Sequence, residues 1–132
     1  MKHATLTSRI IHIFYQVYNE LGYGFLEKVY QNALFYALQQ EGIQVEAHRK
    51  IFVRFRGIIV GEYISDIIAE STIIIEIKAS ETLIPAHEFQ LINYLKCSEM
   101  EVGLLLNFGK TPEFKRKIFE KARHSPTAAA GS

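Results

Sequence analysis

The stretch from Asp66 to Lys78 has the sequence DIIAESTIIIEIK, in which two β-branched runs flank the polar residues Glu70, Ser71 and Thr72. β-Branched side chains favour strands, and a short polar break between two such runs favours a turn. The stretch therefore predicts a β-hairpin. Isoleucines make both of its faces apolar, so we expect the hairpin to be largely buried; they occupy positions 67, 68, 73, 74, 75 and 77.

The length of the turn decides whether the charged residues of this hairpin can act together. A three-residue loop at 70–72 places Asp66 opposite Glu76, with Ile64 opposite Lys78 and the three charges on one face. A two-residue loop would send Asp66 and Glu76 to opposite faces. Opposed residues have Cβ atoms about 4.5–5.5 Å apart, and carboxylates that close repel unless a cation lies between them or one takes up a proton.

The register with the three-residue loop therefore predicts a cation site with a lysine beside it. Oxygen ligands with open positions suit Mg²⁺ or Mn²⁺, which would neutralise phosphate charge and supply a hydroxide nucleophile. Lys78, with an ordinary pKa of about 10.4, would orient the attacking water and stabilise charge on the pentavalent phosphate. The alternative is a half-exposed strand with solvated charges, but charges among isoleucines need a partner.

Two amphipathic helices are expected before the hairpin. Apolar residues at helical spacing predict the first near 8–21 and the second near 26–40, with Gly42 as the stop of the second. Glu27 shares a stripe of the second helix with Leu34 and so points towards the core side. Alternatively, Glu27 only stabilises the helix N-terminus, where a negative charge is favourable.

The other expected elements are strands at about 45–56, 58–69 and 72–79, a helix from Pro85 to about Cys97, a strand at 102–107 and a final element at 114–119. The final element alternates as an edge strand does, although Thr111 could also begin a helix. On the third helix, His87, Gln90 and Tyr94 form one polar stripe. Gln90 could position phosphate or water, whereas His87 is interpreted as an ordinary helix histidine outside the catalytic set.

Composition limits the classes of function. With 132 residues and 48% hydrophobic content, residues 1–123 suit one domain and 124–132 a flexible C-terminal tail. The net charge of +1 gives no global signal for nucleic acid, so phosphate binding would need a local patch. The lone Cys97 excludes a disulfide framework and favours a reducing, cytoplasmic location, and no apolar run is long enough to span a membrane.

Taken together, these residues resemble the GxxExxY family of the PD-(D/E)XK nuclease superfamily. The resemblance covers about 8–119 and rests on four segments. The first is GFLEKVY at 24–30, and the second runs from GEY at 61–63 through Asp66 to EIKA at 76–79. The third runs from HEFQ at 87–90 to YLK at 94–96, and the fourth is NFG at 107–109. Ile64 departs from the family pattern, which often has a basic residue there.

The resemblance implies an α/β fold with a restriction-endonuclease-like core, in which helices flank a central mixed β-sheet in the order α-α-β-β-β-α-β-(β or α). It implies that Asp66 and Glu76 ligate metal and that Lys78 is the catalytic lysine. Glu27 takes the first-helix acidic position, as a further metal ligand, and Gln90 the second-helix glutamine.

The expected function is a Mg²⁺- or Mn²⁺-dependent nuclease, with DNA the favoured nucleic acid. One alternative on the same fold is a nucleic-acid-binding module without catalysis, which would use His48, Arg49, Lys50, Arg54 and Arg56, with Lys115, Arg116 and Lys117 as a second group. Another is a protein-interaction domain or homodimer that pairs through the apolar strands and the edge at 114–119.

Overall fold

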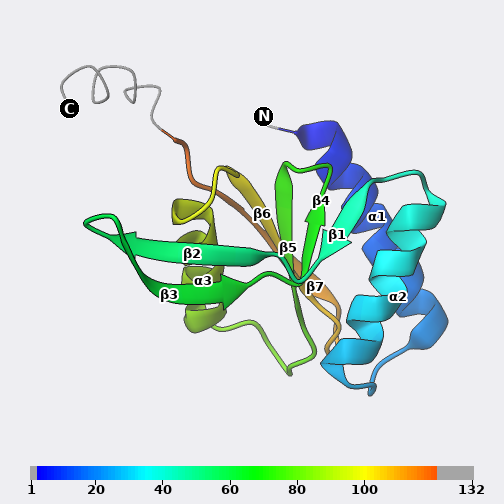
Figure 1. Cartoon of the computed structure of the whole chain (residues 1–132). Coiled ribbons are helices and arrows are strands. Elements are labelled where there is room, and N and C mark those ends of the chain that lie inside the picture. Colours follow the sequence, from blue (N-terminus) through cyan, green and yellow to red (C-terminus); the bar gives the residue numbers. More distant parts are fainter. Residues whose placement is uncertain (1–2, 122–132) are drawn as a thin grey trace.

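The computed structural model describes residues 3–121, so the tail predicted at 124–132 lies outside the described residues. In chain order the elements are α1 (Ala4–Leu21), α2 (Glu27–Gln40), β1 (Val45–Ala47), β2 (Lys50–Phe55), β3 (Ile58–Ile64), β4 (Ile67–Ala69), β5 (Ile73–Lys78), α3 (Pro85–Lys96), β6 (Val102–Asn107) and β7 (Glu113–Ile118). Figure 1 shows helices on both sides of a sheet, which confirms the predicted α/β class.

The central sheet has five strands in the order β1-β4-β5-β6-β7. β5 and β6 are parallel and the other neighbours are antiparallel, so the sheet is mixed as predicted. Parallel neighbours need a crossover connection, and α3 supplies it. β7 lies at the edge, so the edge-strand interpretation of 114–119 is confirmed and the helix starting at Thr111 is wrong.

Alternation along β5 divides its side chains between two cores. Ile73, Ile75 and Ile77 pack with α1 and α2, whereas Ile74 packs with α3. Figure 1 shows α1 and α2 on one face of the sheet and α3 on the other. Side chains two residues apart in a strand point to the same face, so Glu76 and Lys78 lie on the same face as Ile74, which is the face that α3 covers.

The hairpin has the register that the three-residue loop predicted. Ile67 pairs with Ile75, Ile68 with Ile74 and Ala69 with Ile73, which leaves 70–72 as the loop. The predicted pairing of Ile64 with Lys78 is wrong, because Ile64 belongs to β3 and pairs with Lys50.

Two of the expected strands are broken by bends that the sequence did not predict. His48 has a positive φ of 58°, which ends β1 before β2 begins. The backbone N–H and the hydroxyl of Ser65 both donate to the carbonyl of Arg49, at 3.0 and 3.2 Å. These bonds close a neck from which β2 and β3 leave as a separate two-stranded sheet. The expected three strands are therefore five.

Candidate functional site

Asp66 and Glu76 are held together by a reciprocal pair of hydrogen bonds. The backbone N–H of Asp66 donates to Glu76 Oε2 at 2.9 Å, and the backbone N–H of Ile77 donates to Asp66 Oδ2 at 2.8 Å. Asp66 lies in the bend just before β4 rather than in the strand. The structure thus brings together the two carboxylates that the register placed opposite each other, and each retains its second oxygen for a ligand.

The surroundings of this carboxylate pair disfavour negative charge. Glu76 is only 4% exposed, and burial, followed by the charge of Asp66, raises its pKa to about 8. Burial also raises the pKa of Asp66, although the Ile77 N–H and the charges of Lys78 and His48 partly offset this effect. Such a pair is stabilised by a proton or by a cation.

Lys78 and Gln90 come from different layers and meet beside the carboxylates. Lys78 Nζ, at the end of β5, donates to Gln90 Oε1 of α3 at 3.3 Å. The Lys78 charge also lowers the pKa values of Asp66 and Glu76. The ammonium group is therefore held within electrostatic reach of both acids.

The end of β5 is clamped by Asn107, whose role no spacing argument had indicated. This residue is fully buried at the end of β6; its Oδ1 accepts from the Ser80 N–H at 3.0 Å and its Nδ2 donates to the Ser80 carbonyl at 2.9 Å. The Phe108 N–H donates to the Lys78 carbonyl at 2.8 Å. These bonds fix the backbone from which the Lys78 side chain extends.

Glu27 lies at the first turn of α2 and is exposed. Its pKa is raised mainly by partial burial and also by Asp66, while Lys78 and the Ala79 backbone N–H lower it. Its charge therefore interacts with the site, beyond any effect on the helix end. Within residues 3–121, no three His, Cys, Asp or Glu side chains gather into a metal-ligand group, and the role of Glu27 as a further metal ligand stays a prediction.

Several neighbours of the site were not among the predicted residues. Gln31 is buried, with Nε2 2.7 Å from His48 Nε2 and 3.4 Å from the Asp66 carbonyl oxygen. The buried Tyr94 has its pKa raised to about 12, by burial first and then by Glu76 and Asp66. The sequence signal for Gln31 was its position in an apolar stripe of the helix. The bend that brings His48 to Gln31 has no local sequence pattern.

His87, which was predicted to lie outside the catalytic set, makes a hydrogen bond at the start of a helix. Its Nδ1 accepts a hydrogen bond from the Ile84 backbone N–H at 3.2 Å, at the beginning of α3. Burial and the nearby Lys78 charge lower the pKa of His87, which favours the neutral imidazole that can accept this bond.

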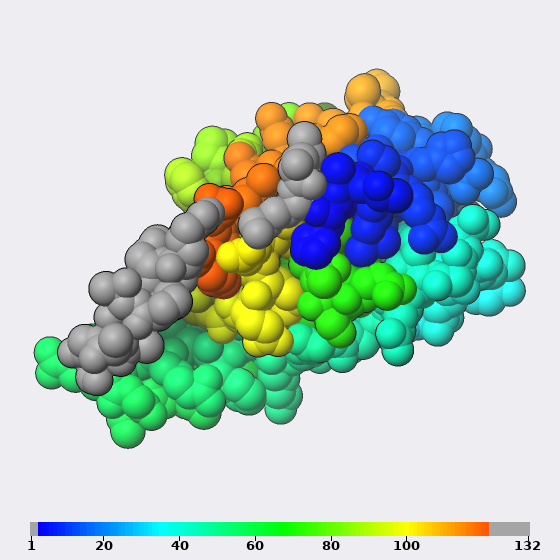
Figure 2. Space-filling model, turned by 90° about the horizontal axis from the view of Figure 1, so that it is seen from above, coloured from blue at the N-terminus to red at the C-terminus, as the bar shows by residue number. Residues whose placement is uncertain are grey.

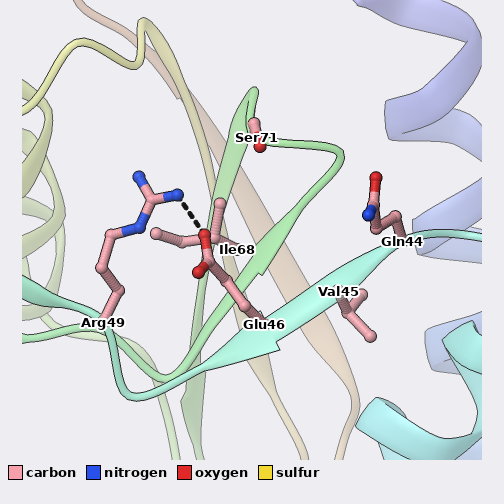
Figure 3. Close-up of a pocket in the computed structure, with 6 residues that line it drawn as sticks. All are labelled: Gln44, Val45, Glu46, Arg49, Ile68 and Ser71. Carbon is pink, nitrogen blue, oxygen red and sulfur yellow. Dashed lines mark hydrogen bonds and ion pairs between the residues drawn. The ribbon is translucent and has the colours of Figure 1, made fainter.

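A hollow of about 240 Å³ lies away from the carboxylates, beside β1 at the edge of the sheet (Figure 3). Its lining residues are Gln44, Val45, Glu46, Arg49, Ile68 and Ser71. Arg49 pairs there with Glu46, and also with Glu99 at 3.5 Å. Lys117 likewise pairs with Glu88 at 2.5 Å. Arg49 and Lys117 are therefore already engaged and are poor candidates for the basic patch expected from the sequence.

Comparison with known proteins places this arrangement in context. A family model described as the PD-(D/E)XK nuclease superfamily matches residues 4–118. Among curated proteins, no match was found. Within residues 3–121, no helix is both long and apolar enough to cross a membrane.

Two solved structures share the fold. The crystal structure of SSO0001 superposes with a TM-score of 0.56 at 19% identity, over 79% of this chain and 55% of that chain. An alkaline exonuclease from Laribacter hongkongensis superposes with a TM-score of 0.54 at 12% identity, over 98% of this chain and 75% of that one. The present chain thus spans about half the length of SSO0001, and at these identities the likeness concerns the fold alone.

Proposed function

The chain belongs to the PD-(D/E)XK nuclease superfamily, and on that premise we propose that it is a metal-dependent nuclease that hydrolyses phosphodiester bonds of DNA. The observation that supports the proposal is the reciprocal pair of hydrogen bonds that holds Asp66 and Glu76 together, with the Lys78 ammonium group beside them. Within the superfamily, the GFLEKVY segment from Gly24 favours the GxxExxY family.

Mg²⁺ or Mn²⁺ fits the donor set. Both carboxylates have raised pKa values, so a bound cation would relieve their repulsion, and Mg²⁺ commonly uses one or two carboxylates and retains several waters. Asp66 and Glu76 would hold the ion through the oxygens that their backbone hydrogen bonds leave available. Bound there, the ion would neutralise phosphate charge and lower the pKa of water. Glu27, whose pKa responds to the charges of Lys78 and Asp66, would be a further ligand of the ion.

The remaining residues act on phosphate and water. The positively charged Lys78 side chain lies beside the two carboxylates. There it would orient the attacking water and stabilise the charge that develops on the phosphate. Gln90 accepts from Lys78 Nζ and so positions the ammonium, leaving its own NH₂ group free to donate to phosphate or water. Clamping by Asn107 keeps the lysine backbone fixed, which limits the reorganisation needed for reaction.

Cleavage assays test the proposal. Single-stranded, duplex and branched DNA should be incubated with the purified protein and Mg²⁺ or Mn²⁺, and at least one of them should be cut. Asp66→Asn and Lys78→Met should each lower the rate by about 10²- to 10³-fold, the usual loss for a group that stabilises transition-state charge.

Matched controls are Glu20→Gln and Lys96→Met, which change an exposed acid and an exposed lysine on other surfaces. Both controls should cut at the wild-type rate. The absence of cleavage on every substrate, or cleavage that survives in Asp66→Asn and Lys78→Met, would contradict a nuclease function at this site.

The alternative is a catalytically inactive nucleic-acid-binding or protein-interaction domain on the same fold. Exposed arginines and apolar side chains on β2 and β3 favour this candidate as a binding module. Binding of DNA with a steep salt dependence, but without cleavage in either metal, would support it. A homodimer, which would let two sites address two strands, and the cytoplasmic location suggested by the lone Cys97 remain proposals.

A further inference from the structure

The β2–β3 hairpin, which we call the arm, is a two-stranded sheet of its own (Figure 1), and β2 as far as Arg54 lines a hollow together with residues 97–100 of the body. Ile51 at the base is 4% exposed and packs in the core beneath α3. Tyr63, its cross-strand partner, packs its ring 4.8 Å from that of Tyr94 in the wall of the carboxylate site. Figure 2 shows the arm, in teal and green, along one margin of the molecule. The base is therefore fixed next to the site.

The tip of the arm exposes large apolar side chains. The exposed fractions are 58% for Phe55, 66% for Ile58, 51% for Ile59 and 60% for Val60. These residues flank a single turn, with the paired Phe55 and Ile58 on one face of the arm and Ile59, paired with Arg54, on the other. A group of this kind on a projecting element marks an interaction surface, because exposure to water gives it no stability.

The charges around this group favour a polyanion. Residues 54–61 contain Arg54 and Arg56 and no acidic residue. Arg54 lies over the Phe52 ring at 5.8 Å and Arg56 over the Phe55 ring at 4.8 Å, and no described carboxylate forms an ion pair with either. The next acid, Glu62, lies 4.0 Å from Lys50, nearer the base. A second copy of the tip would meet these arginines with like charge.

The turn itself places one of these cations at the outermost point. Phe55 pairs with Ile58, so Arg56 and Gly57 form a two-residue turn, and both have positive φ, of 49° and 81°. The first position of such a turn normally carries Asn, Asp or Gly, which adopt positive φ readily. An arginine there accepts an unfavourable backbone conformation and places its guanidinium over the Phe55 ring at the tip of the arm.

We propose that the arm inserts its tip into a groove of duplex DNA and so holds the duplex against the carboxylate site. Arg54 and Arg56 would contact phosphates on the two sides of the groove, and the apolar tip would lie against sugars and base edges. The major groove is about 12 Å wide and admits a two-stranded ribbon, and apolar wedges between arginines also enter minor grooves. This inference rests on the proposed function, because it supplies the substrate of that same site.

The length of the arm sets where it would contact the duplex. Five residues separate the pair Lys50–Ile64 at the base from the pair Phe55–Ile58 at the tip, which at about 3.4 Å per residue is roughly 17 Å. Ile64 lies two residues before Asp66, so the base is beside the site. A length of about 17 Å corresponds to about half a helical turn of duplex DNA. The tip would therefore reach DNA roughly five base pairs from the bond that the site addresses.

Binding measurements without divalent ion test the arm separately from catalysis. Fluorescence anisotropy with a labelled duplex of about 20 base pairs, in EDTA and over a series of salt concentrations, gives the affinity and its salt dependence. Arg54→Ala/Arg56→Ala should lower the slope of log K against log salt by about 2, since each phosphate contact contributes about 0.9. Ile58→Ser/Ile59→Ser should weaken binding about tenfold and leave the slope unchanged.

Matched controls are Lys96→Ala/Lys110→Ala, two exposed lysines outside the arm, and Tyr36→Ser, an aromatic side chain that is 63% exposed on α2. The controls should bind as the wild type does. Melting curves of all variants should coincide with that of the wild type, because the tip contacts no core residue; if the serine variant unfolds, the arginine pair alone carries the test.

Three results would overturn the inference: equal weakening in the lysine control, wild-type binding by both tip variants, or single-stranded DNA of the same length bound as tightly as the duplex. Loss of a dimer in the serine variant with unchanged DNA binding would also overturn it, in favour of a second copy. The binding assay contains no divalent ion, so cleavage is measured separately in the assay described above. Normal cleavage with unchanged binding by the tip variants contradicts the role of the arm alone, whereas arm-dependent binding without cleavage contradicts the nuclease function alone.

Discussion

At the scale of single residues, the chemistry of the site depends on an acid placed where acids are unstable. Glu76 occupies a central strand between Ile75 and Ile77, and its pKa is raised to about 8 because burial and the Asp66 charge disfavour ionisation. The alternative of a solvated strand face is wrong for Glu76, which is 4% exposed. An ionisable group kept at such a cost is a marker of a functional site.

This placement predicts how stability changes with pH in the metal-free protein. In the unfolded chain Glu76 ionises near its ordinary value of 4.5, whereas in the folded chain it holds its proton until about pH 8. The folded state therefore binds more protons between these values, so the free energy of unfolding is highest below about pH 4.5 and falls as pH rises towards 8. At about 1.4 kcal/mol per pH unit between these two values, the contribution of Glu76 is on the order of 5 kcal/mol.

Urea denaturation in EDTA across about pH 5 to 8.5 measures this effect. Glu76→Gln should remove most of the fall, because glutamine does not titrate, whereas Glu62→Gln on the exposed arm should leave it unchanged. A wild-type profile that is flat, or that rises with pH, would show that Glu76 is ionised in the folded protein and that the carboxylate pair is not as described.

At the scale of elements, the features that local sequence patterns determine, such as helix ends and the position of the hairpin turn, were predicted from the sequence. The helices end where Gly22 and Gly42 adopt positive φ values of 76° and 77°, which glycine favours. The polar residues at 70–72 located the turn between β4 and β5 but left two loop lengths open, and the structure has the three-residue loop. The bends at His48 and Ser65 could not be predicted, because no glycine or proline marks either bend and the bonds that make the bends join residues far apart in sequence.

The distance between α3 and the sheet is set by a single glycine. A Cβ atom added at Gly103 of β6 would lie 2.6 Å from Leu91 Cδ1, and Leu91 is fully buried in α3. Gly103→Ala should therefore push α3 outwards, at a cost of about 1–3 kcal/mol in the free energy of unfolding. Because Gln90 lies next to Leu91, the same change should also lower cleavage.

Chemical denaturation and a cleavage assay on Gly103→Ala measure the two effects. Gly61→Ala is the matched control, since its Cβ would meet Val53 at an ordinary 3.7 Å and should change stability little. Equal stability of the two variants would show that α3 does not pack as closely on β6 as the structure has it.

At the scale of the whole molecule, three layers converge at one end of the sheet. The carboxylates and Lys78 come from the sheet, Glu27 comes from α2 on one face, and Gln90 comes from α3 on the other. The net charge of +1 does not reveal this organisation, in which Glu76 is buried while the arginines of the arm are exposed. The layered fold was predicted from motif order, whereas the separate arm required the structure.

The central claim is that Asp66 and Glu76 together bind a divalent ion. The most direct test is an anomalous difference map from crystals soaked in Mn²⁺. We predict a peak between the two carboxylates, about 2.0–2.3 Å from an oxygen of each, which disappears in Asp66→Asn. A peak at another position, or no peak at saturating Mn²⁺ with both carboxylates ordered, would contradict the claim.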